Sequence, residues 1–276
     1  MIYRRHTPGP PLAAFVDFFW FYDCCFPDHS MEKCLPDGTF ELVINLRDEP
    51  RKLFDSDDVG RHTAFRRGWL SGAHSRYIII DAINNSSMIG AHFKSGGAAA
   101  FLKLPAGQLR DQVVELDALW GASAWNWRDR LLAAPGPAAK FQVLERFLLD
   151  HLKEPDRSSQ RRRRVDWALG RFVQRAEVDH VAAVANALGM SHKHFIEEFS
   201  REVGLTPKLF CRIRRFQDVL GRINSGKFVE WADIAYPCGY FDQAHFNHDF
   251  RSFAGLNPSR YLSHLPEYQN YIPLTD

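Results

Sequence analysis

Two groups of side chains in the sequence have the chemistry and the spacing to suggest a metal site. Cys24, Cys25 and Cys34 offer three thiols near the amino terminus, and His245 and His248 stand three residues apart, which places both imidazoles on one face of a helix. A tetrahedral zinc site needs four ligands, and no fourth Cys or His stands at ligand spacing to complete the cysteine group. The sequence therefore predicts neither a metal site nor a bound cofactor.

Other features of the sequence argue against an enzyme and against a membrane protein. No Ser/His/Asp motif, phosphate loop or carboxylate pair stands in a recognisable context, and no run of about 18 apolar residues exists. The odd count of five Cys offers no paired disulfide framework, so we expect a reduced, cytoplasmic chain. From residue 161 onward there are 16 Lys and Arg and 13 Asp and Glu, which is weak electrostatic evidence for nucleic-acid binding.

One segment of the sequence occurs twice. SHKHFIEEFSREVGLTP, residues 191–207, returns 51 positions later as DQAHFNHDFRSFAGLNP. In each copy a capping residue, Ser191 or Asp242, precedes two Phe residues four apart and a Gly suited to ending a helix. Each copy follows a short apolar stretch closed by Gly189 or Gly239. The pattern predicts two helix-turn-helix units, in which the corresponding residues are Phe195 and Phe246, Phe199 and Phe250, Gly204 and Gly255, and Pro207 and Pro258.

A long helix is expected between the two units. PKLFCRIRRFQDVLGRI starts with Pro207, a residue favoured in the first turn of a helix, and continues with apolar residues at helical spacing. About 17 residues at a rise of ~1.5 Å give a rod of roughly 25 Å. Major grooves on one face of a duplex repeat every ~34 Å, so helices held at the two ends of this rod could enter successive grooves.

The amino-terminal part shows the alternation of β-strands. In TFELVINL the apolar residues Phe40, Leu42, Ile44 and Leu46 alternate with other positions, as in a strand with one buried face. The turn signal PDG before it predicts that MEKCL is its hairpin partner. Further strands are expected at 18–22, 76–81 and 87–93, and helical patterns follow from residue 97 to residue 152.

These patterns predict an α+β chain of two domains. KEPDRSSQRRRR at 153–164 is polar, has no apolar face and contains a proline, so it is interpreted as a linker. The expected domains are a β-rich, cupin-like or barrel-like domain with packed helices at 1–152, and an all-α domain of two helix-turn-helix units at 165–265, followed by a tail at 266–276. The all-α domain should begin with a helix that buries Val165, Ala168, Leu169, Phe172 and Val173.

The repeat and its surroundings resemble a known family. Over about residues 175–265 the sequence is similar to the DNA-binding half of the AraC/XylS transcription regulators, and GYFDQAHFNHDFRSFAGLNPSRYL is close to the signature of that family. PDGTFELVINL, GAHFKSGGAAAFL and LRDQVVELDALWG are similar to an uncharacterised sensor-like domain that often precedes such halves. The residues that carry the first resemblance are Ala185, Gly189, Ser191, Phe195, Phe199, Gly204, Pro207, Arg215, Leu220, Ile234, Ala235, Gly239, Asp242, His245, Phe246, Phe250, Gly255, Pro258 and Tyr261.

The resemblance implies which side chains meet DNA. The amides of Gln243 and Asn247 could pair with adenine, and Glu197 could accept a hydrogen bond from cytosine. Arg215 is expected to pack internally. The base-facing positions of the two reading helices fall on His192, Lys193, Ile196, Glu197, Gln243, Ala244, Asn247 and His248, and contacts to the DNA backbone on Ser191, Lys208, Arg212, Arg214, His245 and Arg260.

The resemblance also implies a function, to which two alternatives stay open. We expect a regulator that binds promoter DNA, with RNA polymerase, a small-molecule effector and a second copy of the chain as further partners. Trp20, Glu41 and His92 are candidates for effector contacts, because Glu41 and His92 are polar residues in apolar strands. The family commonly has Arg where this chain has Glu197 and His248, so a scaffold that has lost DNA affinity is one alternative. A zinc-dependent alkyl acceptor is another, although the cysteines lack its ligand set.

Overall fold

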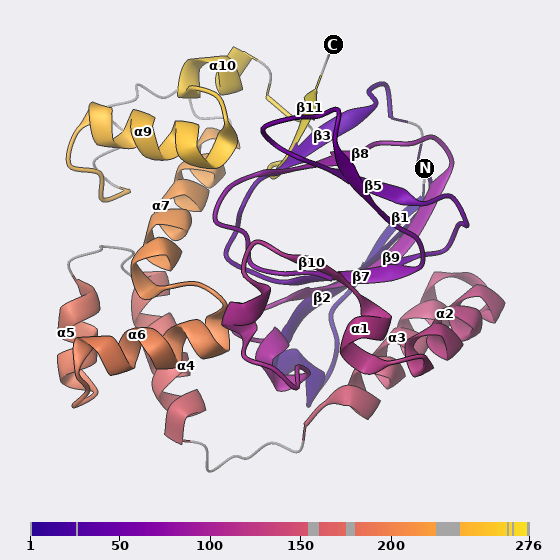
Figure 1. Ribbon diagram of the computed structural model, residues 1–276, viewed down its shortest axis with the longest axis horizontal. Coiled ribbons are helices and arrows are strands. Elements are labelled where there is room, and N and C mark those ends of the chain that lie inside the picture. The colour runs from indigo at the N-terminus through magenta and orange to yellow at the C-terminus, as the bar shows by residue number, and fades with distance from the viewer. Residues whose placement is uncertain are drawn as a thin grey trace.

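The computed structural model describes residues 2–25, 27–153, 160–174, 180–224, 238–263, 265–266 and 268–274. It has a β-rich amino-terminal part and a helical carboxyl-terminal part, which lie side by side (Figure 1). The expectation of an α+β chain, with a β-rich domain followed by an all-α domain, is confirmed.

The β-rich part contains two antiparallel sheets. One has six strands in the order β1-β2-β9-β4-β7-β10, and the other has five in the order β11-β3-β8-β5-β6. The strands are β1 (Ile2–His6), β2 (Val16–Cys25), β3 (Met31–Cys34), β4 (Glu41–Asn45), β5 (Arg51–Phe54), β6 (His62–Phe65), β7 (Gly68–Ser71), β8 (Ile78–Asp81), β9 (Ser86–Phe93), β10 (Val113–Glu115) and β11 (Tyr271–Leu274).

Three α-helices cover one face of the six-stranded sheet, and the five-stranded sheet lies on its other side (Figure 1). Leu42 and Ile44 of β4 belong to the buried core, and Phe19 of β2 stacks on Phe141 of α3 at 6.5 Å. The helical pattern expected from residue 97 is only partly correct, because short 3-10 helices come first. The elements of this region are η1 (Leu12–Ala14), η2 (Ala98–Ala100), η3 (Ala106–Leu109), α1 (Leu116–Trp120), α2 (Ser123–Ala133) and α3 (Gly136–His151).

The hairpin expected between MEKCL and TFELVINL is wrong. Strand β3 pairs with β8 and β11, whereas β4 pairs with β7 and β9 in the other sheet. The turn between them does form: Gly38 has a φ of +83°, and the Thr39 amide donates to Asp37 Oδ1 at 2.9 Å. This turn carries the chain from the five-stranded sheet to the six-stranded sheet. The residue types of a turn do not determine which strands pair on either side of it.

The carboxyl-terminal part contains the two repeated helices on either side of one long helix. Ser191 caps α6 through the His194 amide and Asp242 caps α9 through the His245 amide. Gly204 and Gly255 end these helices with left-handed φ values of 90° and 68°, so the repeat is confirmed as a structural repeat. The helices are α4 (Gln160–Gln174), α5 (His180–Ala187), α6 (His192–Val203), α7 (Pro207–Asn224), α9 (Gln243–Ala254) and α10 (Pro258–Ser263).

Three expectations about this part need comment. Helix α4 begins at Gln160, so residues 160–164 of the expected linker are helical. The arginine run of this segment contacts the rest of the protein: Arg162, for example, donates to the Gly96 carbonyl at 2.6 Å. Val173 is 56% exposed, whereas the other residues expected on the buried face of this helix, Val165, Ala168, Leu169 and Phe172, are buried. The expected first helix of the second unit, before Gly239, lies outside the described residues up to position 237.

The expected tail at 266–276 is also more than a tail. Its residues 271–274 form β11, which pairs with β3 at the edge of the five-stranded sheet. The carboxyl terminus therefore returns to the amino-terminal domain. A single short apolar run at a chain end gives no sign of such a distant partner strand.

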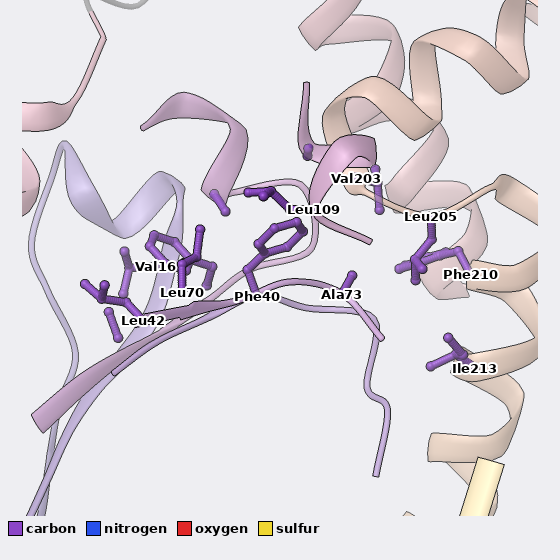
Figure 2. Close-up of a cluster of buried hydrophobic side chains, with 14 of the residues drawn as sticks. Val16, Phe40, Leu42, Leu70, Ala73, Leu109, Val203, Leu205, Phe210 and Ile213 are labelled. Carbon is purple, nitrogen blue, oxygen red and sulfur yellow. The ribbon is translucent and has the colours of Figure 1, made fainter. Parts of the chain in front are cut away.

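The two parts share a buried apolar contact. Figure 2 shows Phe40 of the β-rich part beside Leu70 and Leu109, with Leu205, Phe210 and Ile213 of the helical part next along the same cluster. A Cβ on Gly204 would come 2.8 Å from the Phe40 ring, and a Cβ on Gly107 would come 2.9 Å from the Ser200 carbonyl oxygen. The closeness of these backbones means that the domains are packed together, not merely tethered.

We predict that Phe210→Ala lowers the free energy of unfolding by about 3–5 kcal/mol, because a large fully buried ring is lost from this contact. Phe241→Ala is the matched control, since Phe241 is 83% exposed and its loss should change stability by less than about 0.5 kcal/mol. Urea unfolding followed by circular dichroism measures both. Equal effects of the two substitutions would contradict the packing described here.

Candidate nucleic-acid interface

The two repeated helices pack at different positions along α7, with α6 beside its start and α9 further along it (Figure 1). Phe199 of α6 meets Phe210 near the start of α7 at 5.7 Å, and Phe250 of α9 meets Phe216 further along it at 5.3 Å. Helix α7 has 18 residues, which corresponds to about 27 Å. The rod expected from the sequence is therefore present, with α6 packed near its start and α9 packed near its middle.

The side chains expected to face bases lie at the surface. On α6 they are His192, Lys193 and Glu197, which are exposed, and Ile196, which is half-buried. On α9 the four positions Gln243, Ala244, Asn247 and His248 are all exposed. The opposite faces of both helices are buried through their paired Phe residues. Both candidate reading faces are thus open to a partner.

A buried carboxylate anchors each reading helix to its scaffold, and sequence reasoning missed it. Glu198 of α6 accepts from Arg164 Nε of α4 at 3.0 Å, and Asp249 of α9 accepts from Arg212 of α7 at 2.7 Å. Asp249 is 1% exposed and Glu198 is 7% exposed. A signal was available, because the two carboxylates occupy equivalent positions of the repeat, 51 residues apart.

A histidine accompanies each of these ion pairs. His194 Nε2 lies 3.4 Å from Glu198 Oε1, and His245 Nε2 lies 3.8 Å from Asp249 Oδ2, in both cases one helical turn apart. His245, expected at the DNA backbone, also packs edge-on against Tyr240 at 5.3 Å. Among the described residues no group of three or more His, Cys, Asp or Glu side chains is placed to hold a metal.

The remaining candidates for backbone contacts divide into two groups. Ser191, Lys208 and Arg260 are exposed beside the starts of α6, α7 and α10. Arg212 is engaged by Asp249, and Arg214 lies 3.6 Å from Asp218 on the same helix.

Arg215 packs internally, as expected from the resemblance. It is 4% exposed, donates to the Gly239 carbonyl at 2.8 Å and lies over the Tyr240 ring. This contact joins α7 to the turn before α9 and so helps to fix the second reading helix.

The three residues singled out as effector candidates form one hydrogen-bonded group. Glu41 of β4 accepts from Trp20 Nε1 of β2 through one carboxylate oxygen, and its other oxygen lies 2.6 Å from His92 Nδ1 of β9. Asp37 approaches the far side of the imidazole, at 3.7 Å from Nε2. The side chains of Trp20, Glu41 and His92 are half-buried and lie on the face of the sheet that the helices leave uncovered.

This environment changes the titration of His92. Burial alone would lower its pKa, but the carboxylate of Glu41, with those of Asp37 and Asp17 further away, raises the pKa of His92 to about 9. The imidazole is therefore protonated at neutral pH and balances the charge of Glu41.

The two parts of the chain match two different families. Residues 184–264 match a family described as a helix-turn-helix domain, and residues 4–115 match a family described as a domain of unknown function (DUF6597). None of the described helices is long and apolar enough to cross a membrane.

Individual proteins add to this picture. The chain is 30% identical over 100 residues to an uncharacterised helix-turn-helix-type transcriptional regulator of Haemophilus influenzae. The matched segment makes up 36% of this chain and 33% of that protein. The chain thus spans about a third of the length of the curated relative it matches.

Two solved structures of ToxT from Vibrio cholerae are also similar to this chain, both at 12% identity. The 1.65 Å structure gives a TM-score of 0.49 over 89% of this chain and 98% of that one. The structure with bound unsaturated fatty acid gives 0.45 over 88% and 94%.

Asp249→Asn should lower the free energy of unfolding by about 2–4 kcal/mol, because it removes one partner of a buried ion pair. The matched control is Asp218→Asn, which breaks a partly exposed pair on α7 and should cost less than about 1 kcal/mol. Chemical denaturation measures both variants. If both substitutions have the same small effect, Asp249 does not anchor α9 as described.

His92→Gln should remove a pH-dependent contribution to stability. A group whose folded pKa lies above its unfolded value of about 6.5 stabilises fully below that pH and loses its contribution as pH rises through about 9. The difference in unfolding free energy between wild type and His92→Gln should therefore fall by on the order of 3 kcal/mol between pH 6 and pH 10. The exposed His192→Gln is the control, and a difference for His92→Gln that stays constant with pH would argue against a protonated His92.

Proposed function

We propose that this chain, whose carboxyl-terminal domain is an AraC-type helix-turn-helix domain, is a sequence-specific transcription regulator that reads two successive major-groove segments. The observation that carries the proposal is the placement of two exposed, equivalent helix faces at separate positions along α7, one near its start and one near its middle. One chain then supplies both reading helices, so the DNA site need not be palindromic. The work of such a regulator places it in the cytoplasm, with promoter DNA as its main partner.

The exposed side chains suggest how bases are read. On α9, Gln243 and Asn247 lie one turn apart and present amides suited to the N6 and N7 atoms of adenine. On α6, Glu197 can accept from the N4 amino group of cytosine, with Lys193 exposed one turn earlier. Backbone contacts come from the exposed Lys208 and Arg260 at the starts of α7 and α10.

The β-rich domain is proposed to bind a small effector at Trp20, Glu41 and His92. Trp20 supplies an aromatic surface, and the nearby carboxylates outnumber the protonated His92, so the site suits a ligand that donates hydrogen bonds. Arg5 lies at the edge of this region, where it stacks on Phe18 at 3.5 Å. Dimerisation and recruitment of RNA polymerase are further proposed roles of the whole protein.

A second candidate is a scaffold that has lost its DNA affinity and binds a protein instead. The observation in its favour is the shortage of available positive charge: Arg212 and Arg214 are paired with carboxylates, and Glu197 places a negative charge on the reading face. Selection from random duplexes at low ionic strength separates the candidates, since a scaffold of this kind enriches no sequence.

Asn247→Ala should weaken binding to the selected duplex by about 1–3 kcal/mol and relax the preference at one base pair, because it removes a bidentate contact. Fluorescence anisotropy on the selected duplex and on its single-base variants measures both effects. Asn84→Ala, at an exposed turn of the β-rich domain, is the control. A uniform loss across all duplexes, or no loss, would contradict base reading by Asn247.

Glu197→Arg should strengthen binding to unselected duplexes and steepen the dependence of log Kd on log salt by about one unit, because a repulsive charge becomes a phosphate partner. Titration of salt between low and physiological ionic strength measures the slope. Glu202→Arg, half-buried near the far end of α6, is the comparison. If Glu197→Arg changes neither slope nor affinity, α6 does not lie at the DNA.

A further inference from the structure

The turn that leads into the second reading helix has one residue more than the turn of the first unit. In the first unit Met190 alone stands between Gly189 and the cap of α6. In the second unit Tyr240 and Phe241 stand between Gly239 and the cap of α9. Counted from the closing glycines, Tyr240 corresponds to Met190, and both belong to the buried core. Phe241 is therefore the added residue, and the first unit has no counterpart of it.

Phe241 contributes little to the packing of the fold. It is 83% exposed, the largest value for any large apolar residue in the described part of the chain. A residue directly before a helix cap often packs on the fourth residue of the helix. In α9 that fourth residue is Phe246, which is fully buried and packs on Tyr240 at 5.3 Å. The fold therefore does not account for an aromatic side chain at position 241.

Phe241 lies at the amino-terminal end of the second reading face. It directly precedes Asp242, whose carboxylate accepts from the His245 amide at 2.7 Å and fixes the start of α9. The exposed residues Gln243 and Ala244, which are expected to face bases, follow at once. In helix-turn-helix proteins the amino-terminal residues of the reading helix contact base edges in the major groove. The exposed ring is thus continuous with the surface proposed to meet DNA.

The start of α9 offers an apolar group to a partner. Phe241 and the exposed Ala244 have no charge and no side-chain hydrogen-bonding group, so neither side chain can pair with a phosphate. Base edges present one apolar group in the major groove, the C5-methyl group of thymine, and Phe and Ala are side chains that contact it. An adenine bound by the amide of Gln243 or Asn247 is itself paired with thymine, so A·T pairs suit the whole face.

We propose that Phe241 recognises a thymine through its C5-methyl group, next to the base pair read by Gln243. The inference rests on the proposed function, because it adds one specificity-determining contact to the second reading helix. The first unit lacks this contact: Met190 is buried, and the exposed start of α6 carries the polar residues His192 and Lys193. The two units therefore read their DNA segments by different chemistry, and only the segment bound by α9 depends on a thymine methyl group.

Replacement of each thymine of the selected duplex in turn by deoxyuridine tests this, because it removes the methyl group and leaves the base pair intact. With the full chain, one replacement should raise Kd about fourfold, as expected for one methyl group taken out of water. It should fall in the segment whose base preference Asn247→Ala relaxes. Phe241→Ala should bind the thymine and deoxyuridine duplexes equally. Val59→Ala, an exposed apolar residue of the β-rich domain, is the matched control and should keep the fourfold difference.

Fluorescence anisotropy on these duplexes distinguishes the outcomes. The inference is overturned if no thymine is sensitive, or if Phe241→Ala responds to deoxyuridine as the parent chain does. It is also overturned if Phe241→Ala binds the selected duplex as tightly as the parent chain, which would leave the ring to a protein partner. In these three cases a duplex has still been selected, so the proposed function stands. If no duplex is selected, the proposed function fails and the inference fails with it.

Discussion

The arrangement depends on how rigidly the two reading helices are fixed to α7. Each helix is held by an aromatic contact with this rod and by a buried carboxylate that binds an arginine, Glu198 with Arg164 in the first unit and Asp249 with Arg212 in the second. A helix held only by apolar packing could rotate about its axis, whereas a directed ion pair fixes which side chains face outward. The exposed faces of α6 and α9 follow from this constraint.

The helical domain is in turn fixed to the β-rich domain at two places. Phe40 and Gly107 pack against the carboxyl-terminal half of α6, and the turn containing Gly38 packs against Phe210 of α7. Near the middle of α7, Gln217 makes a polar connection to the turn between the sheets and to the residues that lead into β11. These contacts join α7 to both sheets of the β-rich domain.

Much of this structure was predictable from the sequence where the signal is local or repeated. The caps Ser191 and Asp242, the glycines that end α6 and α9, and the buried Phe pairs all follow from residue types at fixed spacing, and they are confirmed. Partners distant in sequence were not predictable: β3 joins β8 and β11 rather than β4, and the run Arg161–Arg164 belongs to a helix. The grouping of Trp20, Glu41 and His92 needed the strand register, although their types had already marked them as candidates.

The most direct measurement of the central claim is hydroxyl-radical footprinting of the protein on its selected duplex, with the number of bound chains measured in parallel. The account predicts protection of two segments about one helical turn apart on the same face of the DNA, with one chain bound per site. Protection of a single segment, or of two segments only when two chains are bound, would contradict the account.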